Sequence, residues 1–158
     1  NYCTMDNNEK YILKKYSIAK SSDIRDISSM DGYEFEDLIK DLLIKKGFFD
    51  VIRIGGACDR GVDIMAKKQE GSNIEKYIIQ CKRWLGNVGS TPIQRLHSMK
   101  TIENIDHAIC VTTANYTSEG QQVAHTTGVQ LINGSDLMDE LNQYFPGKYY
   151  HAALQLLS

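Results

Sequence analysis

The polar residues of greatest chemical interest lie in two neighbouring segments, residues 62–68 and 76–84. Asp63 lies among residues suited to burial, and a buried carboxylate is costly unless it meets a cation or a metal. Gln80 and Lys82 are separated by one residue, so on a strand they share one face, about 6.6 Å apart. If the two segments pair as a hairpin, Asp63 can face both, which brings a carboxylate, an amide oxygen and an ammonium to one point.

These groups suit the hydrolysis of a phosphodiester. A carboxylate and an amide oxygen are hard ligands for Mg²⁺, which polarises the phosphate and lowers the pKa of a bound water. Lys82 can orient or help deprotonate that water and balance the charge on the phosphate. Glu36, one place past Phe35 at the edge of an apolar helix face, can complete the metal's shell directly or through water. The alternative is a buried Asp63–Lys82 ion pair, with the Gln80 side chain hydrogen-bonded to a loop. The spacing of these residues alone does not decide between a nuclease site and this structural ion pair.

The periodicity of apolar residues predicts the elements that position these groups. It predicts helices over residues 32–46, 90–104, 117–127 and 135–144, and strands over 51–54, 62–68, 76–84, 108–112 and 129–133. We expect the second helix to start at Ser90-Thr91-Pro92, with a hydroxyl side chain as its cap and the proline in its first turn. We expect Ser135 or Asp136 to cap the last helix. The order α-β-β-β-α-β-α-β-α predicts an α/β sandwich around a mixed sheet, antiparallel first and parallel afterwards.

The patterned part of the chain predicts one domain over residues 31–145. Residues 1–30 form a peripheral N-terminal segment in this prediction, with a short helix over 9–16, and residues 146–158 form a C-terminal extension. The chain starts at Asn1 rather than Met, so we expect a piece of a longer protein. There is neither a signal peptide nor an apolar stretch of about 20 residues, so we expect a cytoplasmic protein without a membrane span.

The distribution of charge along the chain and the positions of its cysteines and histidines limit the classes of function that it can have. The four cysteines and four histidines are scattered, which argues against a disulfide framework and a zinc site. A formal net charge of −2 gives no global attraction to nucleic acid. Residues 74–100 nevertheless hold five Lys or Arg against one acid, whereas residues 101–147 hold six acids and no Lys or Arg. A charged partner would therefore meet the middle of the chain, unless this distribution is a chance fluctuation of solvated charges.

Five segments, in this order, resemble the catalytic domain of the Mrr-type restriction endonucleases, a branch of the PD-(D/E)xK nuclease superfamily. They are G-Y-E-F-E at 32–36, G-A-C-D-R-G-V-D at 56–63, Q-C-K-R-W at 80–84, V-T-T at 111–113 and L-I-N-G-S-D-L at 131–137. The resemblance implies a restriction-endonuclease-like three-layer sandwich with a central mixed β-sheet flanked by helices. It also implies catalytic roles for Glu36, Asp63, Gln80 and Lys82, and adds the backbone carbonyl of Cys81 to the metal ligands.

Two departures from the superfamily pattern stand out. Val62 replaces the proline before the aspartate, and Gln80 replaces the second acid, which makes the site less anionic by one charge. The Mrr branch commonly has this glutamine. Candidate DNA contacts flank the site, and each has a structural alternative in packing, turn structure or simple solvation: Arg60, Arg83, Trp84 and Arg95.

The expected function is a metal-dependent DNA endonuclease, in restriction or anti-phage defence, with Mg²⁺ as cofactor and Mn²⁺ as substitute. Its partner would be double-stranded DNA, and cutting two strands with one centre per chain calls for a homodimer. An attached or separate targeting or sensor domain would supply affinity and target choice. The alternative is a non-cleaving nucleic-acid-binding or scaffold module on the same fold.

Overall fold

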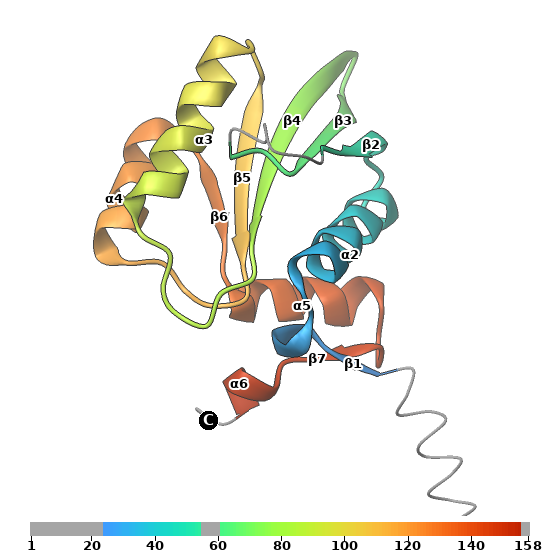
Figure 1. Ribbon diagram of the computed structural model, residues 1–158. Coiled ribbons are helices and arrows are strands. Elements are labelled where there is room, and N and C mark those ends of the chain that lie inside the picture. The colour runs from blue at the N-terminus through green and yellow to red at the C-terminus, as the bar shows by residue number, and fades with distance from the viewer. Residues whose placement is uncertain (1–23, 55–60, 156–158) are drawn as a thin grey trace, which may run out of the picture.

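A computed structural model describes residues 24–54 and 61–155 (Figure 1). At its centre is a five-stranded sheet in the order β2-β3-β4-β5-β6. The antiparallel part comprises β2 (Phe49–Arg53), β3 (Ile64–Glu70) and β4 (Asn73–Lys82), in which β3 and β4 form a hairpin. The parallel part adds β5 (His107–Thr112) and β6 (Gln130–Ile132) to β4. The mixed sheet, antiparallel first and parallel afterwards, confirms the predicted arrangement.

Helices cover both faces of this sheet and make three layers (Figure 1). On one face, α2 (Gly32–Lys45) and α5 (Gly134–Tyr144) pack through residues such as Phe35, Ile39 and Leu141 against Ile64 and Ile79 of the sheet. On the other face lie α3 (Ser90–Ile102) and α4 (Ser118–Thr127), whose apolar residues form a second core. The predicted three-layer α/β sandwich is confirmed.

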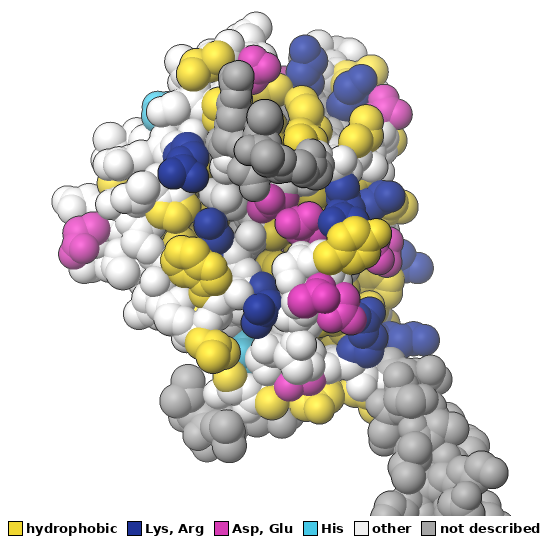
Figure 2. Space-filling model, in the orientation of Figure 1, with side chains coloured by type: hydrophobic (Ala, Val, Ile, Leu, Met, Phe, Trp, Pro, Cys, Tyr) yellow, Lys and Arg dark blue, Asp and Glu magenta, His cyan; other side chains and the backbone are white. Residues whose placement is uncertain are grey.

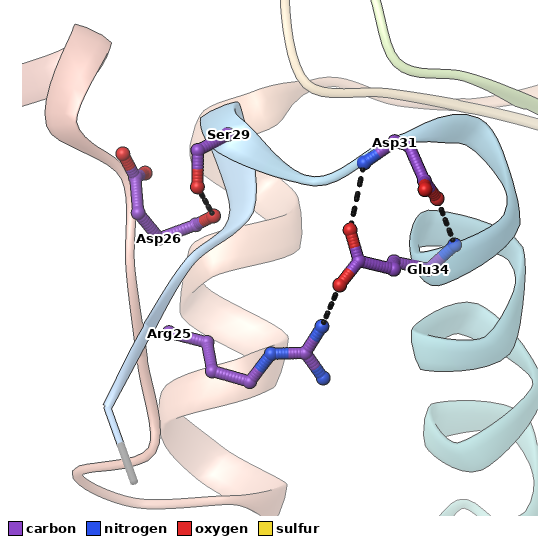
Figure 3. A network of polar contacts seen from close by, with 5 residues as sticks. All are labelled: Arg25, Asp26, Ser29, Asp31 and Glu34. Carbon is purple, nitrogen blue, oxygen red and sulfur yellow. Dashed lines mark hydrogen bonds and ion pairs between the residues drawn. The ribbon is translucent and has the colours of Figure 1, made fainter. Parts of the chain in front are cut away.

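Helix α2, which carries Glu36, begins with a capping box. The Asp31 side chain accepts a hydrogen bond from the backbone nitrogen of Glu34, and the Glu34 carboxylate accepts one from the backbone nitrogen of Asp31 (Figure 3). Glu34 also binds Arg25, which lies on β1 (Arg25–Asp26) (Figure 3). Two orphan amides of the first turn are thus satisfied, which fixes the start of the helix.

Two predicted helix caps are wrong. Helix α3 has Gly89 as its N-cap, with no side-chain hydrogen bond, and Ser90 is already its first helical residue. Helix α5 is capped by Asn133, whose side chain accepts from the backbone nitrogen of Asp136. Since Ser, Thr, Asn and Asp are all good caps, a run such as N-G-S-D does not by itself show which residue takes the extended conformation that a cap needs.

The segments beside the predicted domain limits are part of the fold. Strand β1 pairs in parallel with β7 (Tyr149–Tyr150), and a 3₁₀ turn, η1 (Ile27–Ser29), follows β1. Ile27 belongs to the core beneath α2, and the short helix α6 (Ala152–Gln155) follows β7. The boundaries at 31 and 145 stay a prediction, and the helix predicted over 9–16 lies outside the described residues. Of the helices in the described ranges, not one has the length and apolar character needed to span a membrane.

Candidate active site

Asp63 lies just before β3, at the edge of the hairpin. It is only 7% exposed, and its Oδ2 accepts a hydrogen bond of 2.7 Å from the backbone nitrogen of Cys81 on β4. Its main chain donates to the carbonyl of Ile79 and accepts from the amide of Ile54. These bonds fix the carboxylate beside the peptide that joins Gln80 to Cys81.

Gln80 lies on the face of β4 that α3 covers. Ile78, two residues earlier, belongs to the core beneath α3, whereas Ile79 belongs to the core beneath α2, so the predicted alternation of faces is confirmed. Gln80 is 4% exposed, and its buried Oε1 has no hydrogen-bond partner among the residues that the structure describes. A buried amide oxygen in this state needs a ligand.

Gly61 explains how the turn before Asp63 comes so close to Gln80. A Cβ placed at this glycine would lie 2.8 Å from Cδ of Arg95 and 3.7 Å from Nε2 of Gln80. Its φ of +80° also favours glycine. The glycine therefore lets the backbone approach the Gln80 amide under the Arg95 side chain.

Two cysteine thiols near the end of the hairpin have raised pKa values. Burial raises the pKa of the Cys81 thiol well above its ordinary value, and the charges of Asp63 and Glu36 add to this effect. Burial likewise raises the pKa of Cys110 to about 11, which Lys82 opposes and Asp63 reinforces. Cys81 packs against the core beneath α2, and Cys110 lies in the core beneath α3. The negative charge of Asp63 thus contributes to the raised pKa of both thiols.

The end of β4 is held by two threonines of the V-T-T segment. Thr112 Oγ1 donates to the carbonyl of Lys82, and Thr113 Oγ1 donates to the carbonyl of Trp84. Lys82 is the last residue of β4, and its Nζ lies 4.8 Å from the centroid of the Trp84 ring. The strand had been predicted to continue to Trp84, whereas the chain turns there, with the amide of Trp84 bonded to the carbonyl of Lys82.

Glu36 on α2 is held by an arginine that the sequence analysis missed. Arg53 Nη2 lies 3.0 Å from Glu36 Oε1, and the Arg53 guanidinium lies 3.8 Å from the centroid of the Tyr33 ring. The missed signal was the alternation along β2. Val51, two residues before Arg53, packs against the core beneath α2, so Arg53 is on the face that meets Glu36.

The oxygen donors fit a hard divalent cation. Asp63 provides a carboxylate, and Gln80 provides an amide oxygen without a partner among the described residues. Cys81, whose amide binds Asp63, would add its backbone carbonyl, as the family resemblance implies. Such oxygen ligands suit Mg²⁺ or Mn²⁺. Within residues 24–54 and 61–155, no three His, Cys, Asp or Glu side chains are grouped closely enough to hold a metal. A cation at this place therefore depends on the amide and the backbone oxygen as well as on Asp63.

The residues predicted to contact DNA differ in their exposure and in the elements around them. Arg95 on α3 is exposed and lies over Gly61, close to Gln80. Trp84 is 45% exposed, at the rim of a cavity of about 280 Å³. Arg83 is half-buried, and its Nε has no partner in the described part of the chain. Arg60 lies outside the described residues. Figure 2 shows acidic side chains near the middle of one face, with Lys and Arg side chains on both sides of them.

Three solved structures share the fold at low sequence identity. AspBHI, a DNA modification-dependent restriction endonuclease, is 19% identical with a TM-score of 0.56, over 72% of this chain and 31% of that one. AF1548, a protein of unknown function, is 18% identical with a TM-score of 0.54, over 68% and 64%. The MspJI restriction endonuclease, in complex with a 27-mer oligonucleotide, is 16% identical with a TM-score of 0.53, over 74% and 33%.

The chain therefore spans about one third of the length of AspBHI and of MspJI, 31% and 33%. No curated protein matches it. A family model described as a restriction endonuclease, of the Mrr catalytic type, matches residues 27–141, which include Glu36, Asp63, Gln80 and Lys82. This match over most of the chain shows that the protein belongs to the Mrr-type restriction endonuclease family.

Proposed function

We propose that the chain is a metal-dependent DNA endonuclease that hydrolyses phosphodiester bonds at the site formed by Glu36, Asp63, Gln80 and Lys82. The observation that carries the proposal is the hydrogen bond from the Cys81 amide to Asp63. It fixes a carboxylate next to Gln80, whose amide oxygen has no partner among the described residues. Family membership supports the same reaction class.

Asp63, Gln80 and the carbonyl of Cys81 would hold Mg²⁺, or Mn²⁺ in its place. When bound, such a cation polarises the scissile phosphate and lowers the pKa of a coordinated water. Lys82 orients the attacking water and balances the negative charge that grows on the phosphate. Glu36, on α2, would help to hold the cation, directly or through water.

DNA is the proposed substrate, and restriction or anti-phage defence in the cytoplasm the proposed role. Support comes from the relatives of the same fold, since AspBHI is named a DNA modification-dependent enzyme and MspJI was solved with an oligonucleotide. Arg95, Trp84 and Arg83 flank the site and are the proposed DNA contacts, together with Arg60. Because the chain spans about one third of those two enzymes, 31% and 33%, a further domain or partner would supply target choice.

The proposal is tested by plasmid cleavage with Mg²⁺ or Mn²⁺, compared with EDTA. We expect Asp63→Asn and Lys82→Met each to lower the cleavage rate about 100-fold or more, as loss of a charge-stabilising group at a reacting centre does, and EDTA to abolish cleavage. Matched controls exist on the neighbouring strands β2 and β3. Asp50 and Lys67 form an exposed ion pair at 3.2 Å, so Asp50→Asn and Lys67→Met should cleave like the wild type. Cleavage that persists in both the Asp63 and the Lys82 variants would assign the activity elsewhere.

A further inference from the structure

We propose that Arg53 is a positioning residue that orients Glu36 toward the cation held by Asp63 and Gln80. The inference rests on the proposed function and goes beyond it, because it assigns a role to a residue outside the four-residue site. It starts from one contact, the 3.0 Å ion pair between Arg53 Nη2 and Glu36 Oε1.

The ion pair is more protected from solvent than those on the surface. The side chains of Arg53 and Glu36 are 21% and 22% exposed. Glu34, on the same helix as Glu36, pairs with Arg25 of β1 at the same distance of 3.0 Å, but these side chains are 45% and 47% exposed. Exposed pairs contribute little because water screens them and both chains lose freedom. The shielded pair can therefore fix a carboxylate in a way that the exposed pair cannot.

The Arg53 guanidinium also contacts the ring of Tyr33. It lies over the Tyr33 ring at 3.8 Å, and Tyr33 and Glu36 lie near one another on α2, three residues apart. Although burial alone would lower it, the pKa of Arg53 is raised by its hydrogen bonds with Glu36 and Tyr33. Arg53 is thus a fixed cation rather than a mobile surface charge.

The ion pair with Arg53 leaves one oxygen of the Glu36 carboxylate available. Arg53 binds Oε1 of Glu36, and within the described residues Oε2 has no hydrogen bond. The amide of Cys81 binds Asp63, and the Cys81 side chain packs against the core beneath α2, the helix that carries Glu36. The Arg53–Glu36 pair therefore belongs to the same face of the sheet as the Cys81 side chain. A ligand held by a second residue keeps its orientation without the cation, and removing such a residue costs about 10- to 100-fold in metal affinity or activity.

The test measures Mn²⁺ binding by isothermal titration and plasmid cleavage by steady-state kinetics. We expect Arg53→Met to weaken Mn²⁺ binding and lower kcat by about 10- to 100-fold, with the KM for DNA unchanged. Arg53→Lys keeps the positive charge but lacks the planar guanidinium group. This variant should therefore recover part of the lost Mn²⁺ affinity and part of the lost kcat. Arg25→Met, which removes the exposed pair drawn in Figure 3, should match the wild type. If the methionine variant does not fold, Arg53→Gln replaces it in the same measurements.

Three results would overturn the role of Arg53. Mn²⁺ affinity in the Arg53→Met variant equal to that of Arg25→Met would make Arg53 an ordinary surface residue. Tighter binding would show that Arg53 competes with the cation for Glu36. A rise in the KM for DNA alone would make Arg53 a DNA contact. Each leaves the proposed function standing, which fails instead if the wild type binds no Mn²⁺ and cleaves nothing.

Discussion

Single residues make the candidate cation site weakly anionic. Gln80 occupies the place of the second acid of the superfamily pattern, and Glu36 shares its charge with Arg53. In the proposed site Asp63 would then be the chief negative ligand, and its carboxylate also accepts a hydrogen bond from the amide of Cys81. The affinity of an oxygen-ligand site depends on the charge of its ligands, so the charge at residue 80 should control metal binding directly.

Replacing Gln80 by glutamate should therefore tighten Mn²⁺ binding, by about tenfold, which corresponds to about 1.4 kcal/mol. Without metal the same change places a second carboxylate beside Asp63, so the apparent melting temperature should fall and recover on addition of Mn²⁺. Titration calorimetry and thermal unfolding measure both effects. Gln122→Glu, at an exposed position of α4, is the control. Equal or weaker Mn²⁺ binding in the Gln80 variant would show that residue 80 is not a ligand.

At the scale of elements, the helix α5 is positioned by a close approach of backbone to backbone. Its first residue, Gly134, donates its amide to the carbonyl of Ala114. A Cβ at this position would lie 2.3 Å from the carbonyl oxygen of Thr113 and 3.2 Å from Nε2 of His151. Thr113 also binds the carbonyl of Trp84 just after β4, so the start of α5 and the chain after β4 both depend on the position of Thr113.

Gly134→Ala should lower the free energy of unfolding by about 1–3 kcal/mol, because the added methyl group forces the backbone apart. Gly32 is a matched control, since it is also the first residue of a helix and a Cβ there meets nothing within 4 Å. Gly32→Ala should leave stability unchanged or slightly raise it. Urea unfolding of the two variants gives the comparison. Similar stability of both would contradict the packing described for α5.

The sequence predicts the elements better than their ends. Alternation along β4 correctly placed Gln80 on the face opposite Ile79, because side chains in a strand alternate strictly. The caps of α3 and α5 were missed because several suitable residues stand side by side, and backbone conformation chooses among them. The ion pair between Arg53 and Glu36 joins residues of different elements, so it could be identified only once the tertiary fold was known. The roles of the four proposed catalytic residues remain predictions.

At the scale of the whole molecule, the net charge and the length of this chain limit how strongly we expect it to bind DNA by itself. A net charge of −2 gives little general attraction to DNA. The chain also spans only about one third of AspBHI and MspJI, 31% and 33%. We therefore expect weak DNA binding that falls steeply with salt, and each chain carries one candidate centre.

A double-strand break should consequently need two chains. During cleavage of a supercoiled plasmid, nicked circles should appear first, and the rate of linear product should rise with the square of the protein concentration. Adding excess Asp63→Asn protein should suppress linear product while nicking continues. Gel analysis of the plasmid forms over a concentration series measures this. Linear product that rises with the first power of concentration, and is unaffected by the inactive protein, would argue against a dimer.

The central claim is that one divalent cation binds where Asp63, Gln80 and the carbonyl of Cys81 meet. Anomalous diffraction from crystals grown with Mn²⁺ tests it most directly, because the signal marks the metal itself. We predict a peak in contact with the Asp63 carboxylate and the Gln80 amide oxygen, which is lost in crystals of the Asp63→Asn variant. A peak at another place, or one that persists unchanged in the variant, would contradict this account.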